Sequence, residues 1–246
     1  MRCLGRAAGP CAALTLLLFG SAWDAHVLPW FAARGVSCVA ASLVGAEQAL
    51  LSGESDASMD RAGDAYVQEL ARIAGPKSMF MPVIVAHAMH GLTVQRFLES
   101  HPCRGVVLVH PWSAHNALEA LDSEADAQKI LVHGLHGHAT HARTHLSEQQ
   151  MRVVRSALID FGAKPSLFEG ASATHFPMLV TGFQQQPSDP LASMSDMVEL
   201  QTRYECDLEL VDADASDCKH SLFMLDKHLA IRMSERLLGW MDEYGL

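Results

Sequence analysis

Short, almost entirely apolar runs alternate with segments of helical spacing along this sequence, and this alternation limits the fold more than any other feature. Apolar runs of strand length lie at residues 14–19, 36–42, 82–87, 105–110, 177–183 and 207–211. Segments of helical spacing lie at residues 23–34, 60–73, 91–100, 148–161, 191–204 and 225–240. Strands that read as continuous apolar runs are buried on both faces, and strands separated by helices run in parallel. The sequence therefore predicts an α/β fold, with a mostly parallel sheet covered by helices on both faces.

The alternation of strand-like and helical segments is interrupted between about residues 111 and 176. The clearest helical pattern in this stretch covers residues 148–161 and is closed by Gly162. A chain of 246 residues can bury a large core, and α/β folds of this size are often single domains. We expect one domain over residues 1–246, with a helical insertion at about 111–176.

Composition excludes two classes of partner. The chain has 18 Lys and Arg against 28 Asp and Glu, a formal net charge of -10, whereas a nucleic-acid groove needs clustered cations. No apolar run reaches the roughly 20 residues of a membrane-spanning helix. The six cysteines form no C-x-x-C pair, so we interpret them as reduced and mostly buried.

The N-terminal segment permits two interpretations. Arg2 and Arg6 precede an apolar stretch, as in a signal peptide, but Pro10 interrupts that stretch. The continuation into residues 14–19 favours a core strand over a cleaved signal. The compartment, cytoplasmic or organellar, stays open, as does a targeting role for this segment.

The stretch VIVAHAMHGL, residues 83–92, reads as a strand, a sharp turn and a helix. At the apex of such a turn a nucleophilic serine stands in many hydrolases. Ala88 occupies this apex.

Four stretches in order along the chain resemble the α/β-hydrolase fold family: LLLFGSAWDAHVLPWFAARGVSCVAASL, VIVAHAMHGLTVQRFLE, PMLVTGFQQQPSDP and DCKHSLFMLD. They are similar, respectively, to the oxyanion strand with its following helix and strand, the nucleophile elbow, the strand with the triad acid, and the loop with the triad histidine. The resemblance covers nearly the whole chain and implies that the insertion is a cap or lid. The family's first strands are missing or not recognisable before residue 14.

The resemblance implies a degenerate catalytic triad. Where the family's elbow reads Gly-x-Ser-x-Gly, this chain reads AHAMH, with Ala88 at the serine position and His90 at the second glycine. Gln186 stands where the acid is expected, and Asp189 is poorly placed to replace it. His220 is the one triad position that survives. Because a serine, a histidine and a carboxylate act as a unit, we expect no ordinary serine-hydrolase activity.

The resemblance also assigns an oxyanion hole and a pocket. Backbone N–H groups near Ser21 or Ala22 and from Met89 would form the donor pair. The pocket-lining positions are Phe19, His87, His90 and Trp112, and Phe19 replaces the histidine of the family's His-Gly turn.

The segment HGLHGHATHARTH, residues 133–145, concentrates five histidines. Although His141 and His145 share one helix face, no H-E-x-x-H motif or interleaved cysteine accompanies them. We interpret the segment as a polar part of the lid and expect no metal site and no cofactor.

These observations favour a catalytically inactive α/β-hydrolase homologue with a scaffolding, complex-subunit or ligand-binding role, and its partner would be a protein or a small apolar ligand. Two alternatives remain. One is a serine-independent lyase or oxygenase in which His220 acts as general base on a substrate held by the oxyanion amides. The other is a weak esterase.

Overall fold

Six strands form one sheet in the order β2-β1-β3-β4-β5-β6, and every neighbouring pair is parallel. In this computed structural model the described residues are 15–19, 23, 26–41, 52, 59–74, 81–123, 148–164, 176–183, 192–212 and 226–246. The strands are β1 (Thr15–Phe19), β2 (Ser37–Ala41), β3 (Val83–His87), β4 (Gly105–Val109), β5 (Met178–Phe183) and β6 (Asp207–Val211). The predicted α/β architecture with a parallel sheet is confirmed, and among the described residues no strand precedes β1.

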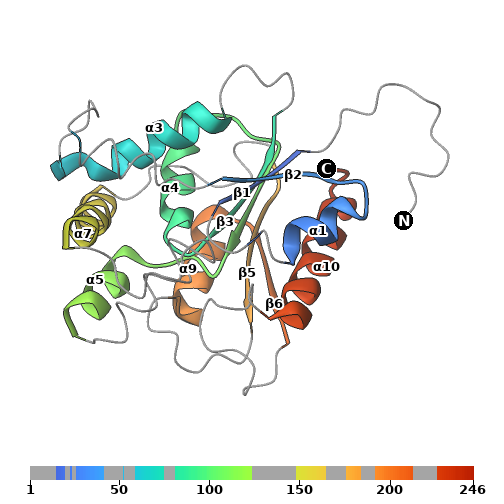
Figure 1. Ribbon diagram of the computed structural model, residues 1–246. Coiled ribbons are helices and arrows are strands. Elements are labelled where there is room, and N and C mark those ends of the chain that lie inside the picture. Colours follow the sequence, from blue (N-terminus) through green and yellow to red (C-terminus); the bar gives the residue numbers. More distant parts are fainter. Residues whose placement is uncertain are drawn as a thin grey trace.

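Helices cover both faces of this sheet (Figure 1). The helices are α1 (Val27–Ala32), α3 (Ala62–Ala74), α4 (His90–Phe97), α5 (Ala114–Ser123), α7 (Glu148–Ala163), α9 (Met194–Tyr204) and α10 (Lys227–Glu243), and the 3₁₀ turn η1 (Met59–Arg61) leads into α3. Helices α1 and α10 lie together on one face, whereas α3, α4 and α9 lie on the other. Helix α7 packs beside α3 and α5, farther from the strands.

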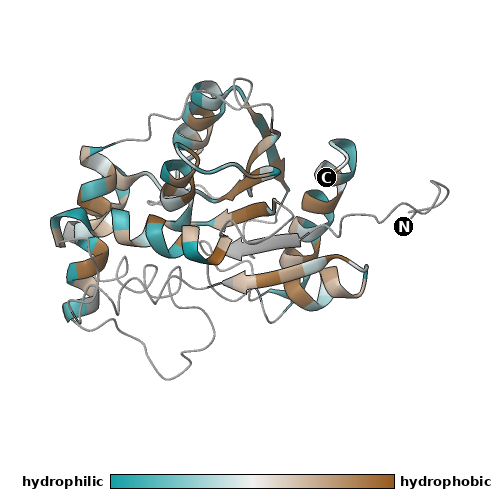
Figure 2. Ribbon diagram, turned by 90° about the horizontal axis from the view of Figure 1, so that it is seen from above, coloured by the Kyte–Doolittle hydropathy of each residue, from teal (hydrophilic) through white to brown (hydrophobic). Residues whose placement is uncertain are grey.

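Two hydrophobic cores result, one on each side of the sheet. In β3, Val83 and Val85 belong to the core with α1 and α10, whereas Ile84 and Ala86 belong to the core with α3, α4 and α7. This alternation follows from the two-residue period of a strand. Figure 2 shows the consequence: most strands are apolar along their length, and the helices carry both apolar and polar residues.

Local side-chain chemistry sets several helix ends. The Ser193 hydroxyl accepts a hydrogen bond from the backbone N–H of Asp196 at 3.2 Å, and the Asp196 carboxylate accepts one from the Ser193 N–H at 3.2 Å. This capping box starts α9, and Glu205, with a left-handed φ of 48°, ends it. The Asp226 carboxylate caps α10 in the same manner, by accepting from two backbone N–H groups.

Some predicted boundaries differ from the structure. The helix expected over residues 23–34 is shorter, because the chain enters α1 through a turn in which the Leu28 N–H donates to the Trp23 carbonyl at 2.9 Å. The helix expected from residue 60 begins as η1 and continues as α3. Within the described residues, no helix is both long enough and apolar enough to span a bilayer.

Candidate functional site

A strained turn joins β3 to α4 at the centre of the sheet. Ala88, between them, has a left-handed φ of 55°, which a residue with a β-carbon adopts at a cost of about 1 kcal/mol or more. The turn is held on both sides: the Ala88 N–H donates to the Val109 carbonyl at 3.1 Å, and the Ala88 carbonyl accepts from the Trp112 N–H at 3.4 Å. The backbone therefore keeps a sharp strand-to-helix elbow although the apex side chain is a methyl group.

Close packing surrounds this elbow. Ala88 and Met89 are both 0% exposed, so the apex does not open to solvent. A β-carbon on Gly91 would lie 3.3 Å from the Pro111 β-carbon, so Gly91 provides the close approach of α4 to the segment after β4. His90, one residue earlier, is accommodated as a buried ring with 3% exposure.

Three buried histidines gather around the elbow: His87 ends β3, His90 begins α4, and His110 follows β4. Burial lowers the pKa of His87 well below its usual value, and the neighbouring charges of His110 and His90 lower it further. Burial also lowers the pKa of His110 to about 4. The rings of His87 and His110 therefore lie in a setting that disfavours a cation. Within the described part of the chain, no group of three His, Cys, Asp or Glu side chains is arranged to hold a metal ion.

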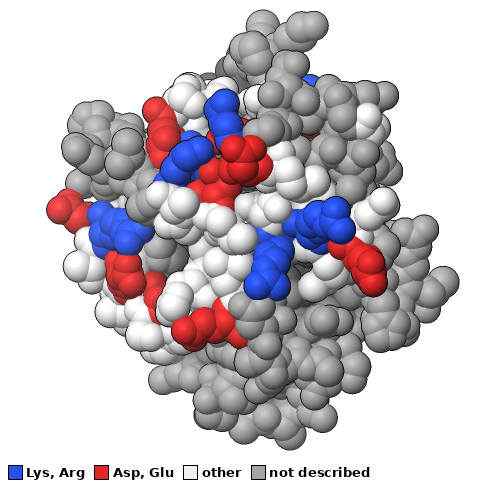
Figure 3. All heavy atoms as spheres, turned by 90° about the vertical axis from the view of Figure 1, so that its left-hand side faces the viewer, with Lys and Arg blue, Asp and Glu red and all other residues white. Residues whose placement is uncertain are grey.

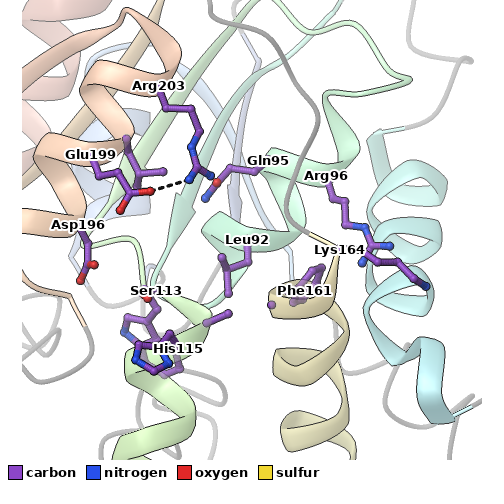
Figure 4. A pocket seen from close by; sticks show the side chains of 14 residues that line it. Leu92, Gln95, Arg96, Ser113, His115, Phe161, Lys164, Asp196, Glu199 and Arg203 are labelled. Carbon is purple, nitrogen blue, oxygen red and sulfur yellow. Dashed lines mark hydrogen bonds and ion pairs between the residues drawn. The ribbon is translucent and has the colours of Figure 1, made fainter.

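A cavity of about 190 Å³ lies apart from the elbow, between α4, α5, α7 and α9 (Figure 4). Its apolar lining includes Leu92, Trp112, Phe161 and Leu200. Trp112 belongs to both regions, because its backbone N–H donates to the Ala88 carbonyl and it is one of the residues that line the cavity. The residues from His87 to His90 are not part of the lining.

Comparison with known proteins decides the fold. Neither a protein-family model nor a curated protein sequence matches this chain. Solved structures do match: Rv0554 from Mycobacterium tuberculosis aligns with a TM-score of 0.60 at 13% identity, over 92% of this chain and 90% of that chain. MGS-MChE2, an alpha/beta hydrolase enzyme from a sediment metagenome of the lagoon of Mar Chica, Morocco, aligns with a TM-score of 0.58 at 11% identity, over 95% and 93%. The chain has the α/β-hydrolase fold. A third match is 2-hydroxy-6-oxo-6-phenylhexa-2,4-dienoate hydrolase from Rhodococcus sp. strain RHA1, with a TM-score of 0.56 at 12% identity, over 95% and 91%.

In the α/β-hydrolase fold the nucleophile stands at the left-handed residue between a central strand and the following helix. That residue is Ala88 in this structure. The residue after Ala88 is Met89, the N-cap of α4, and its oxyanion role stays a prediction from the sequence. Phe19, the last residue of β1, is in register with Ala86 of β3, so β1 ends beside the elbow.

Several expected site residues lie outside the described residues. These are Ser21 and Ala22 of the expected oxyanion turn, Gln186 at the acid position, His220 at the histidine position, and the histidine-rich segment 133–145. Their roles therefore stay predictions from the sequence.

Two other nucleophilic side chains flank β4: Ser113 follows it near the elbow, and Cys103 precedes it at the opposite end of the sheet. The Ser113 hydroxyl accepts the Asn116 N–H at 3.4 Å, the contact of a helix cap at the start of α5. Burial raises the pKa of the Cys103 thiol to about 12, which keeps it protonated and unreactive at neutral pH. Neither group has the environment of an activated nucleophile.

Proposed function

We propose that this chain is a catalytically inactive protein with the α/β-hydrolase fold, retained for a scaffolding, complex-subunit or ligand-binding role. The observation that carries the proposal is Ala88 at the left-handed apex of the elbow. A methyl group cannot attack a carbonyl carbon, so an acyl-enzyme cannot form there. The complete burial of Ala88 and Met89 adds support, because a substrate carbonyl needs access to this turn.

Active-site labelling tests the proposal. The purified protein should not react with a fluorophosphonate probe, and it should release nitrophenol from short esters no faster than its His220→Ala variant. An unrelated serine hydrolase serves as the positive control for the probe. Stoichiometric labelling that maps to Ser113 would contradict the proposal, and so would ester turnover that the His220→Ala change abolishes.

A restored nucleophile tests whether the elbow is still accessible. The single change Ala88→Ser should not produce labelling, because the new hydroxyl would be buried and Gln186 provides no carboxylate for His220. The triple change Ala88→Ser, Gln186→Asp and His90→Gly rebuilds the family's residues at these positions. We expect the triple variant to remain inert when circular dichroism shows that it is folded, since the packing around His90 has changed together with the chemistry.

A further inference from the structure

The cavity between α4, α5, α7 and α9 combines an apolar centre with charged walls. Leu92 of α4 and Phe161 of α7 lie at its centre in Figure 4, and Trp112 and Leu200 add buried apolar surface. Its volume of about 190 Å³ is of the size that holds one six-membered ring, since an engineered cavity of about 150 Å³ binds benzene. The lining side chain of Lys164 is 52% exposed, so the cavity has a solvent-facing mouth beside α7.

Two cationic side chains, Arg96 and Lys164, lie at the α4–α7 end of this cavity. Arg96 binds Asp64 at 2.9 Å and Asp160 at 3.4 Å, and Lys164 binds the other oxygen of Asp160 at 3.2 Å. Asp64 also pairs with Arg61, which does not line the cavity. An anion at this end would therefore meet two cationic side chains, Arg96 and Lys164, that share the buried carboxylate of Asp160.

The opposite wall is less suited to an anion. Arg203 and Glu199 of α9 neutralise each other at 2.6 Å, and Asp196 accepts hydrogen bonds from Asn116 at 2.8 Å and from the Ser193 hydroxyl at 2.6 Å. Figure 3 shows the outer side of the molecule with α3, α5 and α7, where the basic and acidic side chains of the described residues are interspersed. The two neighbouring cations Arg96 and Lys164 therefore belong to one end of the cavity.

Lys164 is the cation that can change partner at least cost. Its side chain is 52% exposed, so water can solvate the ammonium when it leaves Asp160. Asp160, which is 1% exposed, keeps Arg96 as a partner when Lys164 turns away. A bound carboxylate could thus receive Lys164 without leaving Asp160 uncompensated.

We infer that this cavity binds a small carboxylic acid with an apolar body no larger than about one six-membered ring. The carboxylate lies at the Lys164 and Arg96 end, and the ring lies against Phe161 and Leu92. This inference extends the ligand-binding role proposed above but rests on the cavity alone, and it requires nothing of the elbow.

Benzoate is the probe that tests the inference, and the tryptophan indole N–H signals in a nitrogen-15 NMR titration report the site. Trp112 belongs to the core beside the cavity, whereas Trp23, Trp30 and Trp240 belong to the core on the other face of the sheet. Benzoate should shift the signal of Trp112, assigned with a Trp112→Phe variant, and leave the other three unchanged. We expect a dissociation constant in the roughly millimolar range, as for a ligand of this size.

Variants identify the contacts. Lys164→Gln should weaken benzoate binding about tenfold, the effect of losing one charge-assisted contact. Arg236→Gln is the matched control, because it removes one positive charge from α10 on the other face of the sheet and should leave the affinity unchanged. Ala114→Leu, which places a larger side chain in the lining, should weaken binding without unfolding the protein.

Three outcomes would overturn the inference: equal binding of the neutral isostere benzamide, stronger binding of benzylammonium, or no shift of Trp112 at about 20 mM benzoate, well above the expected range. Unchanged affinity in Lys164→Gln would overturn it as well. The tryptophan signals monitor the cavity and fluorophosphonate labelling monitors the elbow, so failure of this inference and failure of the proposed function are separate results.

Discussion

The ring of His110 accepts a hydrogen bond at Nε2 from the backbone N–H of Phe183, 3.3 Å away. The backbone N–H of His110 also donates to the Thr181 carbonyl at 2.9 Å. His110 therefore joins the ends of β4 and β5 through both its backbone and its ring. Because Nε2 accepts, the neutral ring carries its proton on Nδ1. Protonation of Nε2 would break the contact with Phe183 and place a cation in a fully buried site.

Stability should therefore fall as the pH is lowered from about 6.5 to about 4. Burial lowers the pKa of His110 to about 4 in the folded state, from 6.5, so within this window the unfolded chain binds the proton and the folded chain does not. The penalty is absent above pH 6.5 and reaches about 3 kcal/mol near pH 4, at 1.36 kcal/mol per pKa unit. The lowered pKa of His87 acts in the same direction. Urea unfolding at a series of pH values measures this dependence.

The variant His110→Asn isolates the contribution of this ring. Asparagine tolerates the left-handed φ of 45° at this position and does not titrate. Its free energy of unfolding should be lower than that of the parent at pH 8, by about 1–3 kcal/mol for the lost buried contact, and the difference should shrink as the pH falls to 4. An undiminished difference at pH 4 would contradict the role assigned to His110.

Substitutions at Ala88 should follow its left-handed backbone rather than side-chain size alone. Ala88→Gly relieves the backbone strain but raises the conformational entropy of the unfolded chain. Because these effects oppose each other, we expect a change of under about 1 kcal/mol in the free energy of unfolding. Ala88→Val should cost more than about 2 kcal/mol, because a β-branched residue is strained at positive φ and the site is fully buried. Thermal unfolding of both variants measures these changes. Equal stabilities of the two variants would show instead that the site tolerates any apolar residue.

Gly63 and Gly239 form a matched pair of helical glycines. A β-carbon on Gly63 would lie 2.8 Å from the Asp160 carboxylate and 3.0 Å from the Phe161 ring, whereas one on Gly239 would meet nothing within 4 Å. Gly63→Ala should destabilise the protein by about 1–3 kcal/mol through overpacking. Gly239→Ala should stabilise it by about 0.5–1 kcal/mol through helix propensity. Equal effects in chemical unfolding would show that α3 and α7 are not in the close contact described.

The buried carboxylate of Asp160 should matter far more than an exposed one. Asp160→Asn leaves Arg96, which is 12% exposed, with one partner fewer in a buried network, and we expect a loss of about 3 kcal/mol or more. The control Glu199→Gln breaks an exposed pair on α9 and should cost less than about 1 kcal/mol. The fall in melting temperature caused by Asp160→Asn should be nearly the same at low and at high salt, because salt screens buried pairs only weakly.

The amino-acid sequence by itself determined the sheet and its covering helices. The apolar runs at residues 82–87 and 105–110 correspond to β3 and β4 within one residue at each end, because strands buried on both faces contain almost no polar side chains. The turn at Ala88 was also predicted from sequence, since a strand and a helix joined without a loop leave room for only one sharp reversal. The boundaries of α1 were less certain, because its first turn depends on a contact with the Trp23 carbonyl that no local pattern encodes.

Only the tertiary structure decided which distant groups meet. His110 appeared in the sequence as the end of an apolar run, and its contact with Phe183 exists because β4 and β5 are neighbours and Gly182 leaves space for the ring. The sharing of Asp160 by Arg96 and Lys164 likewise depends on α4 meeting α7, which are separated in sequence by residues 98–147. Hydrophobic periodicity records which face of an element is buried but not which element covers it, so the cavity and its charges follow from packing rather than from any one segment.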